Sequence, residues 1–398
     1  MKKIGLFLFD ICFALQMVAQ EQNYFTNPVI RGDVPDPSVI RIEDTYYATG
    51  TSSEWAPFYP MFTSKDLVNW KQVGHVFTKQ PSWTSNSFWA PELFYHNNKV
   101  YCYYTARQKS TGISYIGVAT SDSPLHEFTD HGPIVEYGKE AIDAFIYDDN
   151  GQLYISWKAY GLDTRPIELL GCKLSADGLH LDGEPFTLLV DEKGIGMEGQ
   201  YHFKEGDYYY IVYAAHGCCG PSSDYDVYVA RARNYGGPYE KYSGNPILHG
   251  GEGDYKSCGH GTVVRTSDGR MFYMCHAYLK GDGFFIGRQP ILQEMEMTDD
   301  HWVRFKTGNL AIAEQPIPFV GTKQEPLSDF EDNFKGNQLK VDWTWNYPYS
   351  DIHAVLKKGK LFLSGTPKNN NKYGTALCLR PQSPQYSCET KVINTGKG

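Results

Sequence analysis

Residues 34–48 have the sequence VPDPSVIRIEDTYYA, and this stretch decides the fold because the rest of the chain repeats its pattern. Asp36, an acid between two prolines, opens an alternating strand, and a polar turn connects that strand to a second, aromatic one. The pattern returns at residues 91–102, 143–154, 198–209 and 260–272. Hairpin units that recur roughly every 55 residues indicate stacked blades, and five of them predict a five-bladed β-propeller.

The remaining segments predict a second, smaller unit and a leader. A basic start followed by an apolar run makes residues 1–20 typical of a signal peptide. The propeller is expected over residues 27–314, a proline-containing linker over 315–328, and the start of a β-sandwich-like domain over 329–398, with strands near 354–356, 360–363 and 375–379. The last unit is shorter than the roughly 100 residues of a complete sandwich, so we expect the natural sequence to continue. The fold class is therefore all-β.

Composition limits the partners and the location of the protein. The formal net charge of −9 and the lack of clustered Lys and Arg argue against nucleic acid as a partner. The 30 tyrosines suit blade packing and also the faces of sugars. Beyond the N-terminal stretch no apolar run reaches the ~20 residues of a membrane span. Because residues 1–20 are typical of a signal peptide, we expect an exported protein, either periplasmic or extracellular.

The cysteines leave their pairing open. An oxidising compartment would permit disulfides among the nine cysteines. Cys218 and Cys219 are adjacent, and a bridge between neighbours departs from the usual disulfide geometry. A vicinal bridge, free buried thiols and longer-range pairing are the three alternatives.

Carboxyl groups open three of the five repeats. The first strand of each propeller blade lines the central channel, so Asp36, Asp143 and Glu198 are expected to meet at one mouth. A single acid beside a turn is usually a cap or an Asx-turn, but three acids in matching register indicate a site. Cleavage of a glycosidic bond needs one protonated and one ionised carboxyl group, and like charges in a partly dry pocket raise the pKa of at least one of them.

Six motifs resemble glycoside hydrolase family 43 over about residues 27–315. They lie, in order, at residues 34–39 (VPDPSV), 89–92 (WAPE), 142–144 (IDA), 197–199 (MEG), 259–261 (GHG) and 287–290 (GRQP). The resemblance implies an inverting enzyme on a five-bladed propeller that acts on arabinose- or xylose-containing polysaccharides. Residues 144–145 replace the proline and small residue that follow the middle aspartate in many relatives, but the carboxylate is retained.

The resemblance also assigns roles to residues of this chain. It makes Asp36 the general base, Glu198 the general acid, and Asp143 the residue that orients that acid and tunes its pKa. It implies that Trp89 lines the sugar site and that Arg288 reaches the hydroxyl groups of the bound sugar.

Histidines and one further tryptophan have open interpretations. The resemblance implies that His260 binds substrate and contacts either a structural cation in the channel, frequently calcium, or only hydrogen-bond partners; no cofactor is required for the chemistry. Trp55 is either a rim aromatic that stacks on a sugar or a packing residue. The histidines without metal-ligand spacing are interpreted as structural, namely His75, His96, His202 and His276.

Together these patterns predict a secreted, inverting exo-glycosidase, an α-L-arabinofuranosidase or β-xylosidase, with an oligo- or polysaccharide substrate. An endo-acting arabinanase is one alternative, which an open groove rather than a blind pocket would favour. A carbohydrate-binding propeller without catalysis is another, but it predicts that at least one of the three acids is absent, and all three are present.

Overall fold

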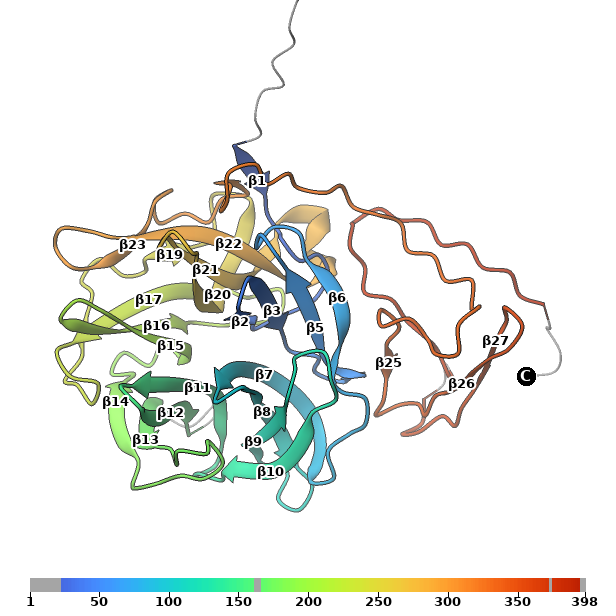
Figure 1. Cartoon of the computed structure of the whole chain (residues 1–398), viewed down its shortest axis with the longest axis horizontal. Helices are drawn as coiled ribbons and strands as arrows, with labels where there is room; N and C mark the ends of the chain where they lie inside the picture. Colours follow the sequence, from blue (N-terminus) through green and yellow to red (C-terminus); the bar gives the residue numbers. More distant parts are fainter. Residues whose placement is uncertain (1–22, 161–165, 372–373, 394–398) are drawn as a thin grey trace, which may run out of the picture.

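The alternating stretches of each repeat fold as antiparallel strands in a computed structural model that describes residues 23–160, 166–371 and 374–393. The strands form five sheets arranged as blades around a channel (Figure 1), which confirms the predicted five-bladed propeller. Blades one and two contain β2 (Ser38–Ile42), β3 (Thr45–Thr49), β5 (Phe58–Ser64) and β6 (Lys71–Phe77), then β7 (Thr84–His96), β8 (Lys99–Gln108), β9 (Ser114–Ser121) and β10 (Thr129–Val135). Blade three contains β11 (Ala141–Asp149), β12 (Gln152–Ala159), β13 (Glu168–Lys173) and β14 (Phe186–Val190). Blades four and five contain β15 (Met197–Glu205), β16 (Tyr208–Ala215), β17 (Asp226–Ala232), β18 (Glu240–Lys241) and β19 (Leu248–His249), then β20 (Tyr255–Arg265), β21 (Met271–Leu279), β22 (Arg288–Met297) and β23 (Val303–Phe305).

Each boundary between neighbouring blades contains its own hydrophobic core. Five buried clusters occur, and each draws residues from two adjacent blades. Tyrosines fill much of this space, for example Tyr103 against Trp157 between blades two and three, and Tyr210 with Tyr273 between blades four and five. The structural role of the many tyrosines is therefore blade packing, as the sequence indicated for most of them.

The ring is closed by the two ends of the propeller sequence. β1 (Tyr24–Thr26) pairs antiparallel with β24 (Glu314–Pro316), and Asn27 makes two side-chain hydrogen bonds to the backbone of Leu292 in blade five. The first strands contact one another in the order β2, β7, β11, β15, β20 and back to β2, so they line the channel. β24 includes Gln315 and Pro316, the first residues of the predicted linker.

A backbone irregularity recurs near the start of every first strand. Asp36, Ala90, Asp143, Gly199 and His260 have φ values of 55°, 40°, 58°, 60° and 47°, in the left-handed region that residues with side chains rarely adopt. In blades two to five the irregularity coincides with a shift of strand register, as in a β-bulge. Such bulges redirect side chains and release backbone N–H groups from the strand ladder.

The positions of these left-handed residues show that the sequence-based alignment of the repeats was off by one residue in blades two and four. The sequence pattern paired Asp36 with Pro91 and Glu198, whereas the structurally equivalent residues are Ala90 and Gly199. Of the five equivalent positions only two, Asp36 and Asp143, are acids. Glu198 lies one residue before the equivalent position in blade four, which is Gly199. A Cβ on Gly199 would lie 2.6 Å from the His260 ring, so glycine is required where these two blades approach each other.

The C-terminal part lies beside blade one (Figure 1). β25 (Trp345–Asn346) pairs with β4 (Trp55–Ala56), and β26 (His353–Leu356) forms a hairpin with β27 (Leu361–Ser364). The third predicted strand was wrong, because Cys378 makes only an isolated bridge to Thr344 and the following Arg380 is drawn onto Gln72 of blade one. The sandwich assignment and the domain boundaries stay predictions.

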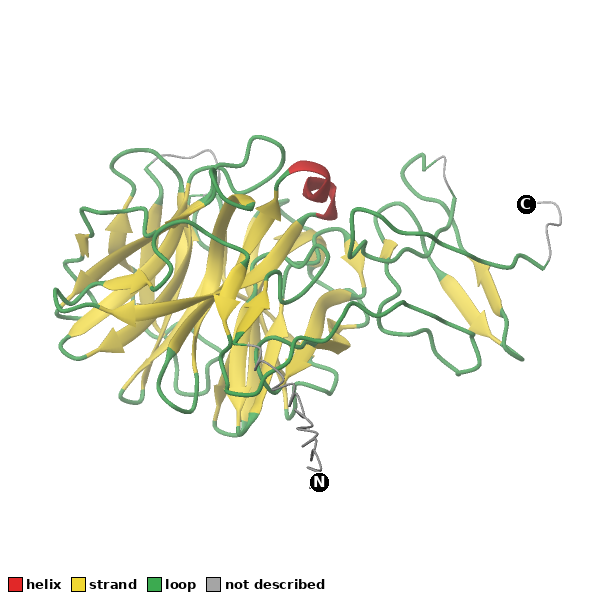
Figure 2. Cartoon of the chain, turned by 90° about the horizontal axis from the view of Figure 1, so that it is seen from above, coloured by secondary structure: helices red, strands yellow, loops and turns green. Residues whose placement is uncertain are grey.

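Two expectations concern membranes and export. The described residues contain no helix long and apolar enough to cross a membrane; their helical element is the short 3-10 helix η1 (Gly281–Ile286), which lies on one face of the propeller (Figure 2). The predicted signal peptide, residues 1–20, lies outside the described residues.

Candidate active site

Asp36 sits at the channel mouth in a set of contacts drawn from blades one and five. Its Oδ2 accepts a 2.6 Å hydrogen bond from the hydroxyl of Thr51, and that hydroxyl accepts the N–H of Ala90 at 2.7 Å. Its Oδ1 lies 3.1 Å from His276 Nδ1, 3.4 Å from His260 Nδ1 and 3.5 Å from a guanidinium nitrogen of Arg288. The carboxylate therefore has a polar partner on each oxygen.

These partners determine the charge of Asp36. Burial raises the pKa of this carboxyl group, but the nearby Arg288 and, after it, His260 outweigh burial and hold the pKa well below its usual range. Burial lowers the pKa of His276 to about 4, so its ring is neutral near pH 7 and Nδ1 can accept the N–H of Asp36 at 3.1 Å. Asp36 is accordingly ionised at any ordinary working pH.

Asp143 comes from blade three and faces the same mouth. Its Oδ2 accepts the N–H of Gly199 at 3.1 Å and lies 3.8 Å from His260 Nδ1. Asp36 and Asp143 therefore lie on either side of one imidazole nitrogen. Burial, together with the nearby Glu198 carboxylate, raises the pKa of Asp143 to about 6.

Glu198 is held by two groups that the sequence did not single out. Its Oε2 pairs with Lys158 Nζ at 2.5 Å, and its Oε1 accepts the hydroxyl of Tyr225 at 3.0 Å. Burial raises the pKa of Glu198, but the charge and hydrogen bond of Lys158 outweigh burial and lower the pKa below its usual value. The raised pKa expected for one of the acids is therefore found on Asp143, the neighbour of the predicted general acid.

The three carboxyl residues are 8%, 6% and 9% exposed for Asp36, Asp143 and Glu198. They come from three blades that are far apart in sequence, and the structure brings Asp36 and Asp143 close to His260, and Asp36 close to Arg288. Their catalytic roles stay predictions.

His260 faces carboxylates rather than a preformed metal site. Its Nδ1 lies near Asp36 and Asp143, and in the part of the chain that the structure describes no group of three or more His, Cys, Asp or Glu side chains is arranged to hold a metal ion. Calcium prefers several oxygen ligands. The described residues do not fit a cation held mainly by protein side chains, and a structural calcium stays a prediction.

The two predicted tryptophans lie near the mouth at different depths. Trp89 is half-buried and directly precedes Ala90, whose N–H binds the Thr51 hydroxyl beside Asp36. Trp55 is 39% exposed and belongs to β4, next to the C-terminal part. Their contact with a sugar stays a prediction.

Sequence reasoning missed a second set of residues that hold the carboxylates. The released N–H groups of three bulge positions donate to side chains from the second strand, or its end, of the preceding blade: Asp36 to His276, Ala90 to Thr51, and Asp143 to Thr105 at 3.2 Å. The interpretation of His276 as merely structural was therefore incomplete, since it contacts Asp36. A signal existed for two of them, because Thr105 and His276 are polar residues within the largely apolar strands β8 and β21.

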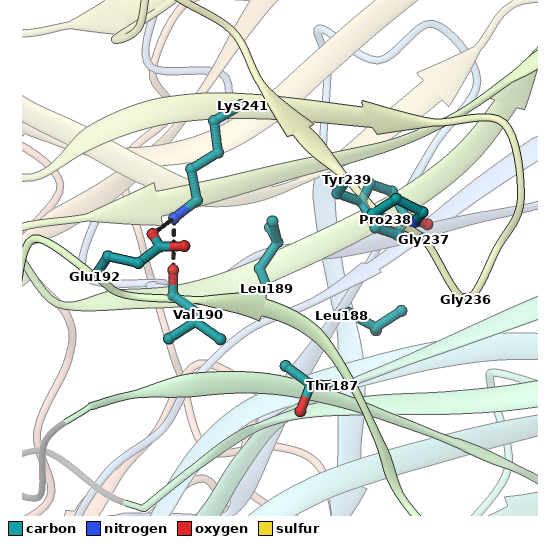
Figure 3. A pocket seen from close by; sticks show the side chains of 10 residues that line it. All are labelled: Thr187, Leu188, Leu189, Val190, Glu192, Gly236, Gly237, Pro238, Tyr239 and Lys241. Atoms are coloured by element: carbon teal, nitrogen blue, oxygen red, sulfur yellow. Dashed lines mark hydrogen bonds and ion pairs between the residues drawn. The ribbon is translucent and has the colours of Figure 1, made fainter.

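A separate hollow of about 630 Å³ lies between β14 and the turn before β18 (Figure 3). Lys241 donates to the carbonyl oxygen of Val190 at 2.5 Å and pairs with Glu192 there. The lining residues are Thr187, Leu188, Leu189, Val190, Glu192, Gly236, Gly237, Pro238, Tyr239 and Lys241. They belong to outer strands and include none of the three channel carboxyl groups, so this hollow is not the candidate active site.

Comparisons with known proteins bear on the family of the chain. The model of glycosyl hydrolases family 43 matches residues 25–303. A xylan 1,3-beta-xylosidase of a Vibrio species is 28% identical over 399 residues, which cover 92% of this chain and 74% of the relative. An extracellular exo-alpha-(1->5)-L-arabinofuranosidase of Cellvibrio japonicus is 30% identical over 309 residues, covering 68% of this chain and 84% of the relative.

The fold is also found among solved structures. The Bacteroides ovatus xyloglucan PUL GH43B superimposes with a TM-score of 0.76 at 23% identity, covering 90% of this chain and 72% of that one. At this identity the likeness concerns the fold.

Proposed function

We propose, from the premise that the chain belongs to glycosyl hydrolases family 43 and hydrolyses glycosidic bonds, that it is an inverting exo-enzyme which releases terminal arabinose or xylose from plant polysaccharides or their oligosaccharides. One observation carries the proposal. Three buried carboxyl groups from three blades share one channel mouth, and their partners keep Asp36 ionised while raising the pKa of Asp143. A site with one permanent base and one group able to hold a proton near neutral pH suits a single displacement.

The proposed reaction uses the residues in fixed roles. Asp36 takes a proton from a water molecule, whose oxygen attacks the anomeric carbon from the side opposite the leaving group. Glu198 gives its proton to the glycosidic oxygen as the bond from the anomeric carbon to that oxygen breaks. Asp143 shares the proton with Glu198. It also accepts the N–H of Gly199, the residue after Glu198, and so helps to orient the acid. Each turnover transfers the elements of water to the two products, and the carboxyl groups then regain their starting protonation.

The C-terminal part supports exo action over endo action. β25 pairs with β4, and Tyr347 packs its ring 5.0 Å from Phe58 and donates hydrogen bonds to Glu54 and to Ser85. This contact places the C-terminal part against blade one, next to Trp55. We propose that it closes the mouth on that side, which would favour a pocket for a chain end over a groove that is open at both ends.

The sugar is proposed from the comparisons. The relatives above are named as a xylosidase and an arabinofuranosidase, which supports a terminal pentose as the group released. Action outside the cytoplasm is part of the same proposal and rests on residues 1–20 alone; an N-terminal sequence of the mature protein starting near residue 20 would support it.

The test is hydrolysis of a panel of nitrophenyl pentosides, arabinan and xylan oligomers by the purified protein, with the first anomer formed followed by NMR. We expect release of single pentoses with inverted configuration. Retained configuration would exclude the single displacement, long oligosaccharide products would favour an arabinanase, and failure on every pentoside would overturn the proposal.

A variant of Glu198 tests the role of the acid. Glu198→Gln cannot donate a proton, so we expect a loss of about 10²–10⁴-fold in kcat on a disaccharide and a much smaller loss on a dinitrophenyl pentoside, whose leaving group needs no proton. If Asp143→Asn shows this dependence on the leaving group and Glu198→Gln does not, the proton donor is Asp143.

A further inference from the structure

The loop between β16 and β17 contains the adjacent cysteines whose pairing the sequence left open. Cys218 and Cys219 form a disulfide with each other, whereas the other cysteines within the described residues are free. Cys219 is exposed and Cys218 is half-buried, so the bridge lies at the surface of the molecule.

Contacts at both ends place this loop on the wall of the active-site mouth. Tyr225, at its end, donates to Glu198, the predicted acid. The N–H of Gly220, next to the disulfide, donates to the Tyr278 hydroxyl at 3.1 Å, and Tyr278 is the register partner of Arg288, which reaches Asp36. The loop that carries the disulfide is therefore linked to Glu198 through Tyr225, and through Tyr278 to the strand pair that carries Arg288.

Polar groups beneath the disulfide fix the loop. The Ser223 hydroxyl donates to the backbone oxygens of Gly217 at 2.9 Å and Cys218 at 3.1 Å and lies 2.7 Å from the hydroxyl of Ser257. The N–H of Gly217 is bound by the Asp224 carboxylate at 2.8 Å. These bonds tie the backbone of the loop to Ser223 and Asp224, while Cys219 stays exposed.

The neighbouring rim is apolar as well. Phe284 stacks on Tyr278 at a ring distance of 4.6 Å, and Phe285, the next residue of η1, is 55% exposed. Sulfur is soft and polarizable and packs well against carbon surfaces. Disulfide and rings together form a surface with little capacity for hydrogen bonds, which suits the face of a sugar ring that bears C–H groups.

We propose that the Cys218–Cys219 disulfide is a binding platform for the pentose on the leaving-group side of the scissile bond. This inference rests on the proposed function. The buried carboxylates mark the floor, where the released sugar binds, whereas the disulfide is exposed on the rim. Glu198 hands its proton to the oxygen that joins the two sugars, so the leaving sugar lies on the side of Glu198, where the same loop is anchored through Tyr225.

The test compares a substrate that has a leaving sugar with one that lacks it. The enzyme is assayed on a pentose disaccharide and on the matching pentosyl fluoride, whose leaving group is a single atom. The ratio of the two kcat/KM values is then measured for the parent, for the parent reduced with dithiothreitol, and for the double variant Cys218→Ser/Cys219→Ser. We expect the ratio to fall about fivefold in both altered forms, the size expected from losing one small apolar contact.

Reduction of the parent protects the test against misfolding of the double variant, since it alters a protein that is already folded. Cys388→Ser removes the exposed free thiol of the C-terminal part and is the matched control, with an unchanged ratio expected. A ratio that stays within about twofold after reduction, or an equal loss on both substrates, would overturn the platform while the proposed function stands. A parent inactive on both substrates would overturn the proposed function, and the platform with it.

Discussion

Asp36 and Asp143 occupy equivalent positions in blades one and three, and their carboxyl groups nevertheless differ in charge. Both adopt a left-handed backbone, with φ values of 55° and 58°, and they are 8% and 6% exposed. Both donate their N–H to a side chain of the preceding blade, His276 and Thr105 respectively. Yet the pKa of Asp36 lies well below its usual range, whereas burial and Glu198 raise that of Asp143 to about 6.

Partners from other blades make the difference. Burial raises the pKa of both carboxyl groups, so burial cannot separate them. Asp36 faces the guanidinium of Arg288 and the hydroxyl of Thr51, while Asp143 faces a second carboxylate, Glu198. The repeated blade structure places each acid at the mouth. The residues around the acid are not repeated from blade to blade, and they determine its charge and therefore its role.

The largest expected effect separates the two aspartates by activity. Asp36→Asn removes the ionised base, and we expect kcat to fall by about 10³-fold. Asp143→Asn keeps a group that can accept the Gly199 N–H and loses only its charge, so we expect a smaller loss of about 10- to 100-fold. Steady-state kinetics on one pentoside measure both.

The matched control is Asp44→Asn, an exposed aspartate of the same blade that pairs with Lys65, for which activity should be unchanged. Equal losses for Asp36→Asn and Asp143→Asn would mean that the two aspartates share one role, and the comparison would fail.

Removing Lys158 should widen the difference in pKa between Asp36 of blade one and Asp143 of blade three. In the parent we expect an alkaline limb of kcat/KM near pH 6 and no acid limb above about pH 4, because Asp36 stays ionised. Lys158 stabilises the ionised forms of Glu198 and Asp143, so in Lys158→Met their pKa values rise. The protonated acid then persists to higher pH, and the alkaline limb moves upward.

The control for this variant is Lys306→Met, which breaks the 2.7 Å pair with Glu294 in blade five and should leave the pH profile in place. An alkaline limb of Lys158→Met that stays fixed or moves downward would show that the limb does not report the Asp143 and Glu198 pair.

Much of the fold could be predicted from the sequence, because the hairpin repeat is local and hydrophobic alternation marks each strand. The backbone shift at Ala90 and Gly199 could not, since a bulge moves the register by one residue without changing the composition of the strand. The C-terminal strand at residues 375–379 was mispredicted because contacts of Arg380 with blade one, distant in sequence, override its local β propensity.

The residues of the candidate site also divide into those that the sequence predicted and those that it did not. The carboxylates were found because each opens a repeat, and Arg288 and Trp89 because they belong to motifs of a known family. Lys158 and Tyr225 were missed, since a lysine inside a strand or a tyrosine just before one gives no sign of which distant carboxylate it meets. The charges of the acids depend on these partners, so the protonation of the site could not be read from the repeat alone.

The smallest expected effect concerns Tyr225, which contacts both a partner of Asp36 and the neighbour of Asp143. Its ring stacks on His276, the partner of Asp36, at 5.6 Å, and its hydroxyl binds Glu198. Tyr225→Phe keeps the ring and deletes only the hydrogen bond that lowers the pKa of Glu198. We therefore expect a loss in kcat of about 2- to 10-fold and an upward move of the alkaline limb in the direction of Lys158→Met.

Tyr255→Phe is the control that isolates this hydrogen bond. Tyr255 is a fully buried tyrosine of blade five whose hydroxyl has no hydrogen-bond partner among the described residues, so its removal should change neither kcat nor the pH profile. If Tyr225→Phe lowers kcat but leaves the alkaline limb in place, the hydroxyl positions Glu198 without tuning it. The charge of the acid would then be set by Lys158 alone, and the link between the two halves of the site would be the stacked rings of Tyr225 and His276.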